Sequence, residues 1–455
     1  MENRFAQHWA VAEFIKFALP LIMGLITISV YMMVDAVFVS RFAGPLALAA
    51  VNIIMPLFNL GIGLAIMVAA GSSAVIGFEM GEGNSEKANR HFSLVFCFLL
   101  AVMIAFFWGG QAWGIEKIAR LLGASPALLP YCTDYLGVFI FGISAVLLQL
   151  FFEYFIRLDG KPLWAFFITL ASGLTNVVLD YWLIAELGMG IKGAGIASSA
   201  GILVAVILGS LYFCFFSVHL KPSRPVIDCK FLGRVLVNGS SEMATEVSSG
   251  VKILVFNLII IQYAGESGVA AIAILMNLYF VLSAFHIGLI MGVAPVVSFN
   301  FGAQNFSKIR QLVGQALTAS LGASLLVFAF ARFQGLHLIR MFTANGHVFR
   351  LTADGLKIFG FTFLVNGITI LASGFFTAAG NGKISALIAC LNSFVFTLGF
   401  VSLLPGFLGL TGVWISIPLA ETIAMCLSVA FFIKYKGVYL VPTPQDASKR
   451  IHPYC

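Results

Sequence analysis

The chemistry available to this sequence centres on a few polar side chains in a very apolar chain. In the stretch TNVVLDYWLI, residues 175–184, Asn176 and Asp180 are four residues apart, so a helix would present both on one face. Asp35 is another isolated carboxylate in an earlier apolar stretch. A carboxylate at the centre of a membrane helix costs about 2.5–3.5 kcal/mol even on a lenient scale, which indicates a functional reason for keeping it. Such carboxylate and amide oxygens suit Na⁺, and a carboxylate pair can hold a proton.

Membrane-spanning helices must position these residues. Hydrophobic residues make up 60% of the 455 residues and charged residues only 10%, whereas soluble domains contain about a quarter charged residues. Continuous apolar stretches of about 20 residues indicate helices rather than barrel strands. The predicted fold is an all-α integral membrane protein. The twelve predicted spans are roughly 14–39, 46–77, 92–113, 131–156, 163–185, 194–217, 235–264, 268–299, 309–333, 355–380, 384–407 and 410–433.

The chain divides into two related halves. Residues 44–87 align without gaps to residues 265–308, with thirteen identities over 44 positions. An offset of this size after six helices predicts two parallel, pseudo-symmetric six-helix lobes, an arrangement typical of transporters. The predicted parts are an N-terminal lobe, a polar linker, a C-terminal lobe and a tail, at residues 1–216, 217–234, 235–440 and 441–455.

The distribution of basic residues predicts the orientation. The N-terminus, the even-numbered loops and the tail hold 17 Lys and Arg residues, and the odd-numbered loops hold 8. Both termini and the linker are therefore predicted to be cytoplasmic, in a multi-pass protein of the bacterial cytoplasmic membrane. Because the net charge of +7 comes from these loops, no nucleic-acid partner is predicted. The seven cysteines lack metal-ligand spacing, and no disulfide framework is expected.

This topology places five polar residues of the first half at one depth in the outer leaflet. Asp35 is six residues before Arg41 and Asp180 is six before Glu186, the residues at which their helices are predicted to leave the membrane, about 9 Å along a helix. Two carboxylates in a low dielectric cannot easily both be ionised without a cation, so the pair is expected to bind H⁺ or Na⁺. Taken singly, Asn176, Tyr135 and Ser198 could equally well hydrogen-bond a neighbouring helix. No Asp or Glu occurs between Lys383 and Ala420, so the acidic layer belongs to the N-terminal half.

The second half carries a different set of polar residues. Glu242, Glu246 and Lys252 lie in one predicted span, with Glu246 and Lys252 on either side of its midpoint. They form a candidate substrate-binding or second titrating site, although a structural pairing of a glutamate with Lys252 is an equal alternative. His286 is a further candidate, more often a hydrogen-bonded bundle residue than a proton relay. Glu421 lies deep in the last span without a partner that the sequence identifies.

Several stretches resemble the multidrug and toxic compound extrusion (MATE) family. They are FALPLIMG with VDAVFVSR in the first span, NVVLD, KGAGIAS and GVAPVVSFNFGAQN. The match looks closer to the DinF- and MepA-like branches than to the NorM type, and it extends over nearly the whole chain. The resemblance implies two six-helix lobes, a coupling ion bound by Asp35, Asn176 and Asp180, and supporting oxygens from Tyr135 and Ser198. Ser198 stands where Thr is commoner in the family.

The function implied by the resemblance is cation-coupled antiport of amphipathic, often cationic organic compounds. The expected partners are small organic substrates and the lipid bilayer, the chain is expected to be monomeric, and H⁺ or Na⁺ as coupling ion stays open, with no other cofactor. A lipid-precursor flippase of the same superfold is the alternative, but it would need more Arg and Lys in the membrane. The absence of HExxH and of GxxxxGK[ST] argues against an enzyme.

The orientation can be tested with a single cysteine introduced near Pro225, in the predicted cytoplasmic linker. The 17-to-8 distribution of basic residues predicts that an impermeant thiol reagent added outside intact cells does not label it. Efficient labelling from outside would reverse the predicted topology.

Overall fold

The structure is a computed structural model that describes residues 11–343 and 345–439. These residues form helices and connecting loops, without strands; the predicted tail, 441–455, lies outside them. The first half contains α1 (Val11–Phe38), η1 (Val39–Ala43), α2 (Pro45–Gly81), α3 (Ser85–Trp113), α4 (Ile115–Leu121), α5 (Leu129–Leu158), α6 (Pro162–Asp180), η2 (Tyr181–Glu186) and α7 (Gly190–Phe215). The second half contains α8 (Cys229–Gly302), α9 (Phe306–Phe342), α10 (Gly346–Phe359), α11 (Thr362–Ala378), α12 (Gly382–Cys390), η3 (Leu391–Thr397), α13 (Leu398–Leu408) and α14 (Leu410–Tyr439).

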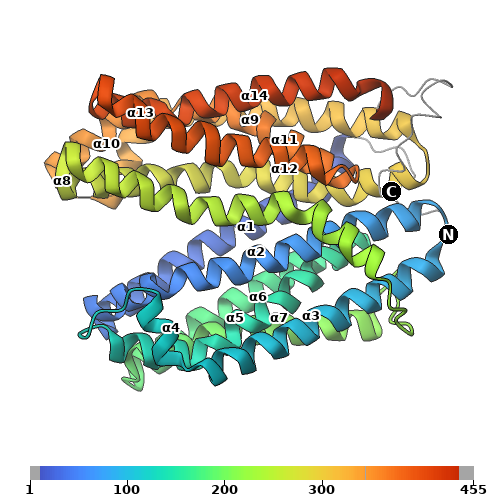
Figure 1. Ribbon diagram of the computed structural model, residues 1–455, viewed down its shortest axis with the longest axis horizontal. Coiled ribbons are helices and arrows are strands. Elements are labelled where there is room, and N and C mark those ends of the chain that lie inside the picture. The colour runs from blue at the N-terminus through green and yellow to red at the C-terminus, as the bar shows by residue number, and fades with distance from the viewer. Residues whose placement is uncertain (1–10, 344, 440–455) are drawn as a thin grey trace. The chain divides into compact units, whose positions relative to one another are not determined.

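The helices account for the predicted membrane spans. Ten described helices are long and apolar enough to cross a membrane, and the pair α10–α11, bent by 57°, adds one more if it counts as a single span. α8 has 74 residues, about 110 Å if straight, although the apolar core of a bilayer is only about 30 Å thick. Gly265 interrupts α8 with φ 58° and ψ −155°, and Figure 1 shows this helix turning back on itself. Division of α8 at Gly265 gives twelve segments, which confirms the predicted fold class.

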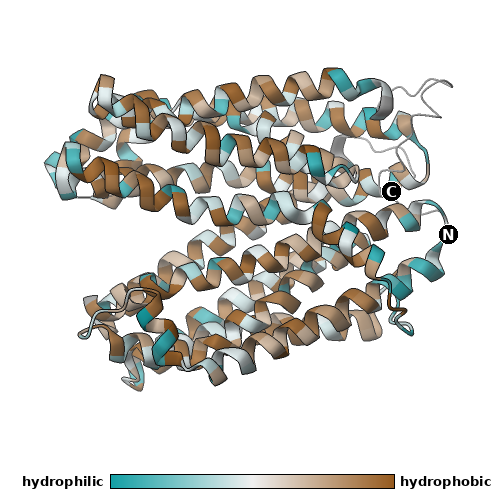
Figure 2. Ribbon diagram, viewed as in Figure 1, coloured by the Kyte–Doolittle hydropathy of each residue, from teal (hydrophilic) through white to brown (hydrophobic). Residues whose placement is uncertain are grey.

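The hydropathy of the helices fits a membrane environment. Figure 2 shows hydrophobic residues along most of the helix lengths, whereas hydrophilic residues gather mainly at helix ends and in loops. In lipid every backbone N–H and C=O must find a partner within the protein, and an α-helix provides these partners within one segment. A multi-pass helical membrane protein follows from this pattern.

The helices form two compact units. The N-terminal unit is Leu19–Gly239, and the C-terminal unit begins at Ser240 and includes residues 11–18 of α1. In the N-terminal unit α5 is central, because it packs against α2, α3, α4, α6 and α7. In the C-terminal unit α8, α10, α11 and α14 form a core around Phe359, Phe363 and Trp414. α8 therefore starts in one unit and continues in the other.

Two glycines on α7 let neighbouring helices come close to the predicted cation site. A Cβ atom on Gly195 would lie 3.1 Å from the Tyr135 carbonyl oxygen of α5, and one on Gly201 would lie 2.8 Å from the Ser172 carbonyl oxygen of α6. Small residues are what membrane helices use to bring their backbones together. These contacts set α5, α6 and α7 close enough for short polar side chains to meet.

The repeated halves begin corresponding helices in the same way. The Asn84 side chain accepts a hydrogen bond from the Lys87 N–H at 3.3 Å and caps α3. Asn305, its aligned counterpart, accepts from the Lys308 N–H at 3.2 Å and caps α9. The matched sequences FEMGEGNSEK and FNFGAQNFSK thus encode the same turn and helix start, because an Asn at this position satisfies an N–H that the helix leaves unpaired.

A buried carboxylate holds the connector between α7 and α8, residues 217–228. Asp159, only 1% exposed, accepts hydrogen bonds from the Tyr212 hydroxyl at 2.6 Å and from the N–H groups of Val218, His219 and Leu220 at 2.8, 2.7 and 2.9 Å. Hydrogen bonds to a charged group are among the stronger ones in proteins. The connector is therefore fastened to the N-terminal unit from its first residues.

Asp159→Ala should lower the free energy of unfolding by roughly 3 kcal/mol, because it removes an acceptor that serves four donors. Thermal unfolding of the detergent-solubilised protein would measure the loss. Tyr212→Phe removes one donor only and should have a clearly smaller effect. An unchanged unfolding temperature for Asp159→Ala would contradict the role given to this carboxylate.

Candidate cation-binding site

The N-terminal unit brings the five predicted residues together. The carboxyl groups of Asp35 on α1 and Asp180 on α6 are close enough for their charges to interact. The Tyr135 hydroxyl on α5 interacts with Ser198 on α7 and with the charges of both aspartates. Asn176 donates from Nδ2 to the Ser198 hydroxyl at 3.3 Å. Four helices therefore deliver these side chains to one cluster.

Wide helical turns follow both aspartates. η2 begins at the residue after Asp180, and η1 begins four residues after Asp35. The two π-helical segments pack against each other. Single π-helical turns occur frequently at functional sites, because the extra residue in the turn shifts the positions of the side chains that follow. Asp180 thus lies directly before backbone that departs from regular α-helical hydrogen bonding, and Asp35 lies one helical turn before such backbone.

The cluster contains buried oxygen atoms without a donor. Asp35 Oδ1, Asn176 Oδ1 and both carboxylate oxygens of Asp180 accept no hydrogen bond from any described residue. Asp180 is completely buried and Asn176 is 4% exposed. An unpaired buried oxygen costs free energy, and an unpaired carboxylate costs far more. A proton shared by the aspartates, or a Na⁺ ion held by these oxygens, would satisfy them, so the donor set fits either ion.

Tyr31 is a neighbour of this cluster that sequence reasoning missed. It lies on α1 and interacts with the charges of Asp35 and Glu153. A Cβ atom on Gly173 of α6 would approach the Tyr31 ring to 2.8 Å, so this glycine makes room for it. The signal in the sequence was the spacing of four residues between Tyr31 and Asp35, which puts both on one face of the helix.

Among the predicted residues of the second half, Glu246 is a charge neighbour of both Glu242 and Lys252, whereas His286 has other contacts. Glu242 and Glu246 interact electrostatically on the same face of α8. Lys252 is near the charges of Glu421 and Glu246, without an ion pair within 4.0 Å to either in the described part of the chain. His286 is elsewhere among α9 residues: Nε2 lies 3.1 Å from the Ser324 hydroxyl and 3.3 Å from the Ser320 carbonyl oxygen.

Glu421 is the centre of a polar cluster that the sequence did not reveal. Its Oε1 accepts hydrogen bonds from the Tyr279 hydroxyl and from Asn392 Nδ2, each at 3.1 Å. Glu421 is 7% exposed, and Asn392 lies on η3, the third π-helical segment. The only sequence signal was an isolated amide in an otherwise apolar span. In the C-terminal unit, Lys252 supplies positive charge near the buried carboxylate of Glu421.

Comparison with known proteins gives consistent matches. Residues 20–182 and 242–403 match the model of the MatE family. The multidrug export protein MepA of Staphylococcus aureus (strain bovine RF122 / ET3-1) is 25% identical over 434 residues, which cover 92% of each chain. MepA of Staphylococcus saprophyticus is 25% identical over 425 residues, with the same coverage.

Solved structures share the fold. The outward-facing conformation of a multidrug resistance MATE family transporter of the MOP superfamily has a TM-score of 0.88 at 20% identity, covering 94% of this chain and 96% of that one. A MOP superfamily transporter from Pyrococcus furiosus has a TM-score of 0.87 at 20% identity, covering 93% and 96%. At this level of identity the structural matches speak for the fold alone.

A double-mutant cycle should identify the main partner of Lys252. The coupling free energy of Lys252→Met with Glu421→Gln should be about 1 kcal/mol or more, and larger than that of Lys252→Met with Glu246→Gln, because Glu421 is its strongest charge neighbour. Thermal unfolding at neutral pH measures both cycles. A larger coupling with Glu246 would assign the lysine to the other glutamate.

Proposed function

Because the chain belongs to the MatE family of multidrug efflux transporters, we propose that it is a cation-coupled antiporter that exports amphipathic, often cationic organic compounds by alternating access. The observation that carries this proposal is the set of four buried, unpartnered oxygens on Asp35, Asn176 and Asp180. The name of the similar MepA proteins, multidrug export protein, supports the substrate class. The named relatives are transporters, which points away from an enzyme.

In the proposed coupling step, the charge of the Asp35–Asp180 pair controls how close α1 and α6 lie. When no ion is bound, Asp35 and Asp180 repel each other unless one is protonated, and this repulsion disfavours the close arrangement of α1 and α6. Binding of H⁺ or Na⁺ from outside reduces the negative charge of the pair and so favours the close arrangement of α1 and α6. The ion can shift the conformational equilibrium only by the difference between its affinities for the two states, so its site must differ between them.

The other three residues of the cluster keep the pair in position. Asn176 supplies a neutral amide oxygen beside Asp180, while its Nδ2 is held by Ser198 at 3.3 Å. The Tyr135 hydroxyl is near Ser198 and both aspartates, so it can donate to a carboxylate. If the ion is Na⁺, Asp35, Asn176 and Asp180 are its ligands; if it is H⁺, the two carboxyl groups share it.

The proposed setting is the bacterial cytoplasmic membrane, with a monomer that has both termini and the connector in the cytoplasm. The excess of Lys and Arg in the loops on that side supports this orientation. In this orientation ions from outside the cell bind at the Asp35–Asp180 pair in the outer leaflet. They are then released to the cytoplasm, and the organic substrate is exported.

Asp35→Asn and Asp180→Asn should each reduce gradient-driven export at least tenfold, because a neutral amide cannot exchange charge with the coupling ion. Proteoliposomes loaded with a fluorescent organic cation, and given either a Na⁺ or a pH gradient, measure the rate and identify the ion. Substrate binding and abundance in the membrane should stay normal.

Asp134→Asn is the matched control, since Asp134 is an exposed acid next to Tyr135 on α5. It should export at the wild-type rate. Export at near wild-type rates by the Asp35→Asn, Asp180→Asn double variant would move the coupling site away from this cluster.

A further inference from the structure

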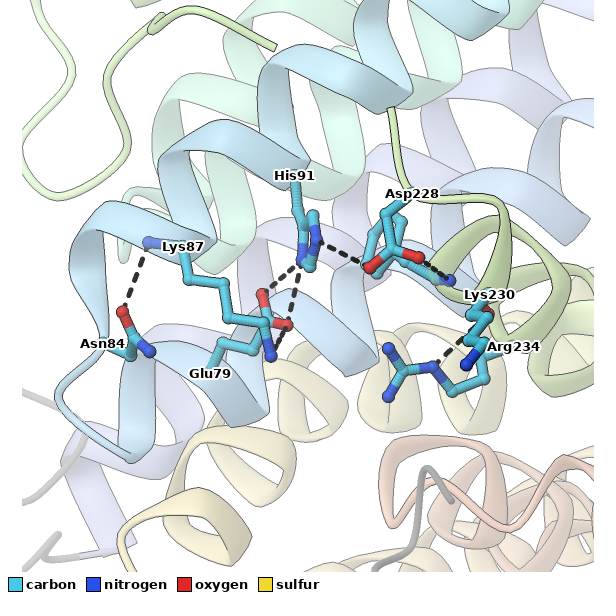
Figure 3. Close-up of polar contacts among 8 residues, drawn as sticks. Glu79, Asn84, Lys87, His91, Asp228, Lys230 and Arg234 are labelled. Atoms are coloured by element: carbon cyan, nitrogen blue, oxygen red, sulfur yellow. Dashed lines mark hydrogen bonds and ion pairs between the residues drawn. The ribbon is translucent and has the colours of Figure 1, made fainter. Parts of the chain in front are cut away.

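A second buried cluster lies where α2 ends and α3 begins, far along the chain from the aspartate pair. Figure 3 shows His91 between two acidic side chains. Its Nδ1 lies 2.9 and 2.8 Å from the two carboxylate oxygens of Glu79, and its Nε2 lies 3.7 Å from Asp228 Oδ2. Glu79 and His91 are 2% and 4% exposed. The Lys87 ammonium also reaches Glu79 Oε1, at 3.1 Å.

Asp228 connects this cluster to the start of α8. Its carboxylate accepts a hydrogen bond from the Phe231 N–H at 2.9 Å, and the Phe231 ring stacks on the His91 ring with centroids 3.8 Å apart. The Phe231 N–H, together with His91 and Arg234, holds the pKa of Asp228 below its usual range. Asp228 therefore stays ionised across the range in which an imidazole titrates.

The residues around His91 also hold the connector. The Asn89 side chain accepts from the Lys221 N–H at 2.9 Å, and the Ser93 hydroxyl accepts from the Ser223 N–H at 2.8 Å. Both belong to α3 and lie two residues before and after His91. Unlike Asn89 and Ser93, His91 carries an imidazole ring, which can donate through one nitrogen or through both.

The first residues of α8 are packed against α2 at the level of the backbone. A Cβ atom on Gly239 would overlap the Met67 carbonyl oxygen at 1.8 Å, and one on Gly71 would lie 2.2 Å from the Val235 carbonyl oxygen. Residues up to Gly239 belong to the N-terminal unit, and the rest of α8 belongs to the C-terminal unit. How firmly the start of α8 is held therefore bears on the motion that alternating access requires.

We propose that His91 is a regulatory proton-binding site, and that its protonation locks the connector and the start of α8 onto the N-terminal unit. A neutral imidazole donates through one nitrogen, whereas an imidazolium donates through both and joins Glu79 to Asp228. With both ring nitrogens protonated the clasp is closed; with one proton lost, the ring can donate to only one of the two carboxylates and the connector loosens. The compartment that is sensed is the one facing the connector, the cytoplasm in the proposed orientation.

The other charged groups around His91 permit this extra charge. From α2 it faces Glu79, from its own helix Lys87, from the connector Asp228, and from α8 Arg234, which is near Asp228. When the imidazole is neutral, Lys87 lies near the negative charge of Glu79 and Arg234 near that of Asp228. A proton added to the ring lies between the carboxylates of Glu79 and Asp228.

The second half of the chain provides an internal comparison. At the offset of 221 residues that relates the halves, Asn300 occupies the position of Glu79 and Leu312 that of His91. Asn and Leu do not titrate, so the proton site belongs to the half that carries the connector. For an exporter driven by inward ion flow, closure at low cytoplasmic pH would slow further proton entry; this use rests on the proposed function.

Hydrogen–deuterium exchange of the full-length protein tests the clasp without any transport. The amides of Lys221, Ser223 and Phe231 should be about tenfold more protected at pH 5.5 than at pH 8, after correction for intrinsic exchange, because the imidazolium adds a charged contact to Asp228. His91→Gln, which keeps a polar side chain but cannot titrate, should abolish this step. Asp228→Asn, which weakens one side of the clasp, should reduce it.

Two controls separate proton binding from general loosening. Lys87→Met retains the imidazole and both carboxylates and should keep the pH step, and Asn89→Ala should lower protection equally at both pH values. The proposal is overturned if the wild type shows no step or if His91→Gln retains it. Because no transport is measured, failure of the antiport proposal would leave this result interpretable.

A transport measurement identifies the compartment. Exchange of a fluorescent organic cation at equal concentrations, with pH lowered on one side of proteoliposomes of known orientation, should slow about tenfold when the connector side is acidified, in proportion to closure of the clasp. His91→Gln should remove this effect. Slowing only from the opposite side would overturn the assignment of the sensed compartment.

Discussion

A carboxylate inside a helical membrane protein has to be neutralised, because the apolar surroundings provide no water to solvate its charge. Asp35 and Asp180 are close together, and neither oxygen of Asp180 accepts a hydrogen bond from a described residue. Their repulsion can be relieved by a proton, by a metal ion or by separation of α1 and α6. We propose that the arrangement of α1 and α6 depends on whether such an ion is bound, because coupling requires this dependence.

The two units treat buried carboxylates differently. In the N-terminal unit two acids lie together. Within the described part of the chain, no cationic side chain donates a hydrogen bond to Asp180. In the C-terminal unit Glu421 has two hydrogen-bond donors, Tyr279 and Asn392, and the charge of Lys252 nearby. A built-in ammonium cannot be exchanged with the solution, whereas a proton or Na⁺ can. The pseudo-symmetric halves therefore share a helix start and turn, but they differ in how their buried carboxylates are neutralised.

Charged side chains also hold the connector, residues 217–228, on the N-terminal unit. Asp159 accepts hydrogen bonds from four donors, the Tyr212 hydroxyl and three backbone N–H groups of the connector. His91 is different, since it lies between Glu79 and Asp228 and has two ring nitrogens to offer. A rigid and a titratable fastening thus act on one segment, and only the second can respond to its surroundings.

The sequence by itself determined the all-helical membrane fold and the relation between the halves, and it predicted a common depth for Asp35, Tyr135, Asn176, Asp180 and Ser198. Bilayer thickness and helical rise are properties along one dimension, so they can be counted from residue numbers. Only the tertiary structure decided which helix faces touch. It placed Tyr31 beside Asp35, gave Glu421 its partners and left the Asp180 oxygens unpartnered. Those contacts depend on helix rotation, on π-helical turns and on glycines that admit a neighbouring backbone, and none of these follows from depth alone.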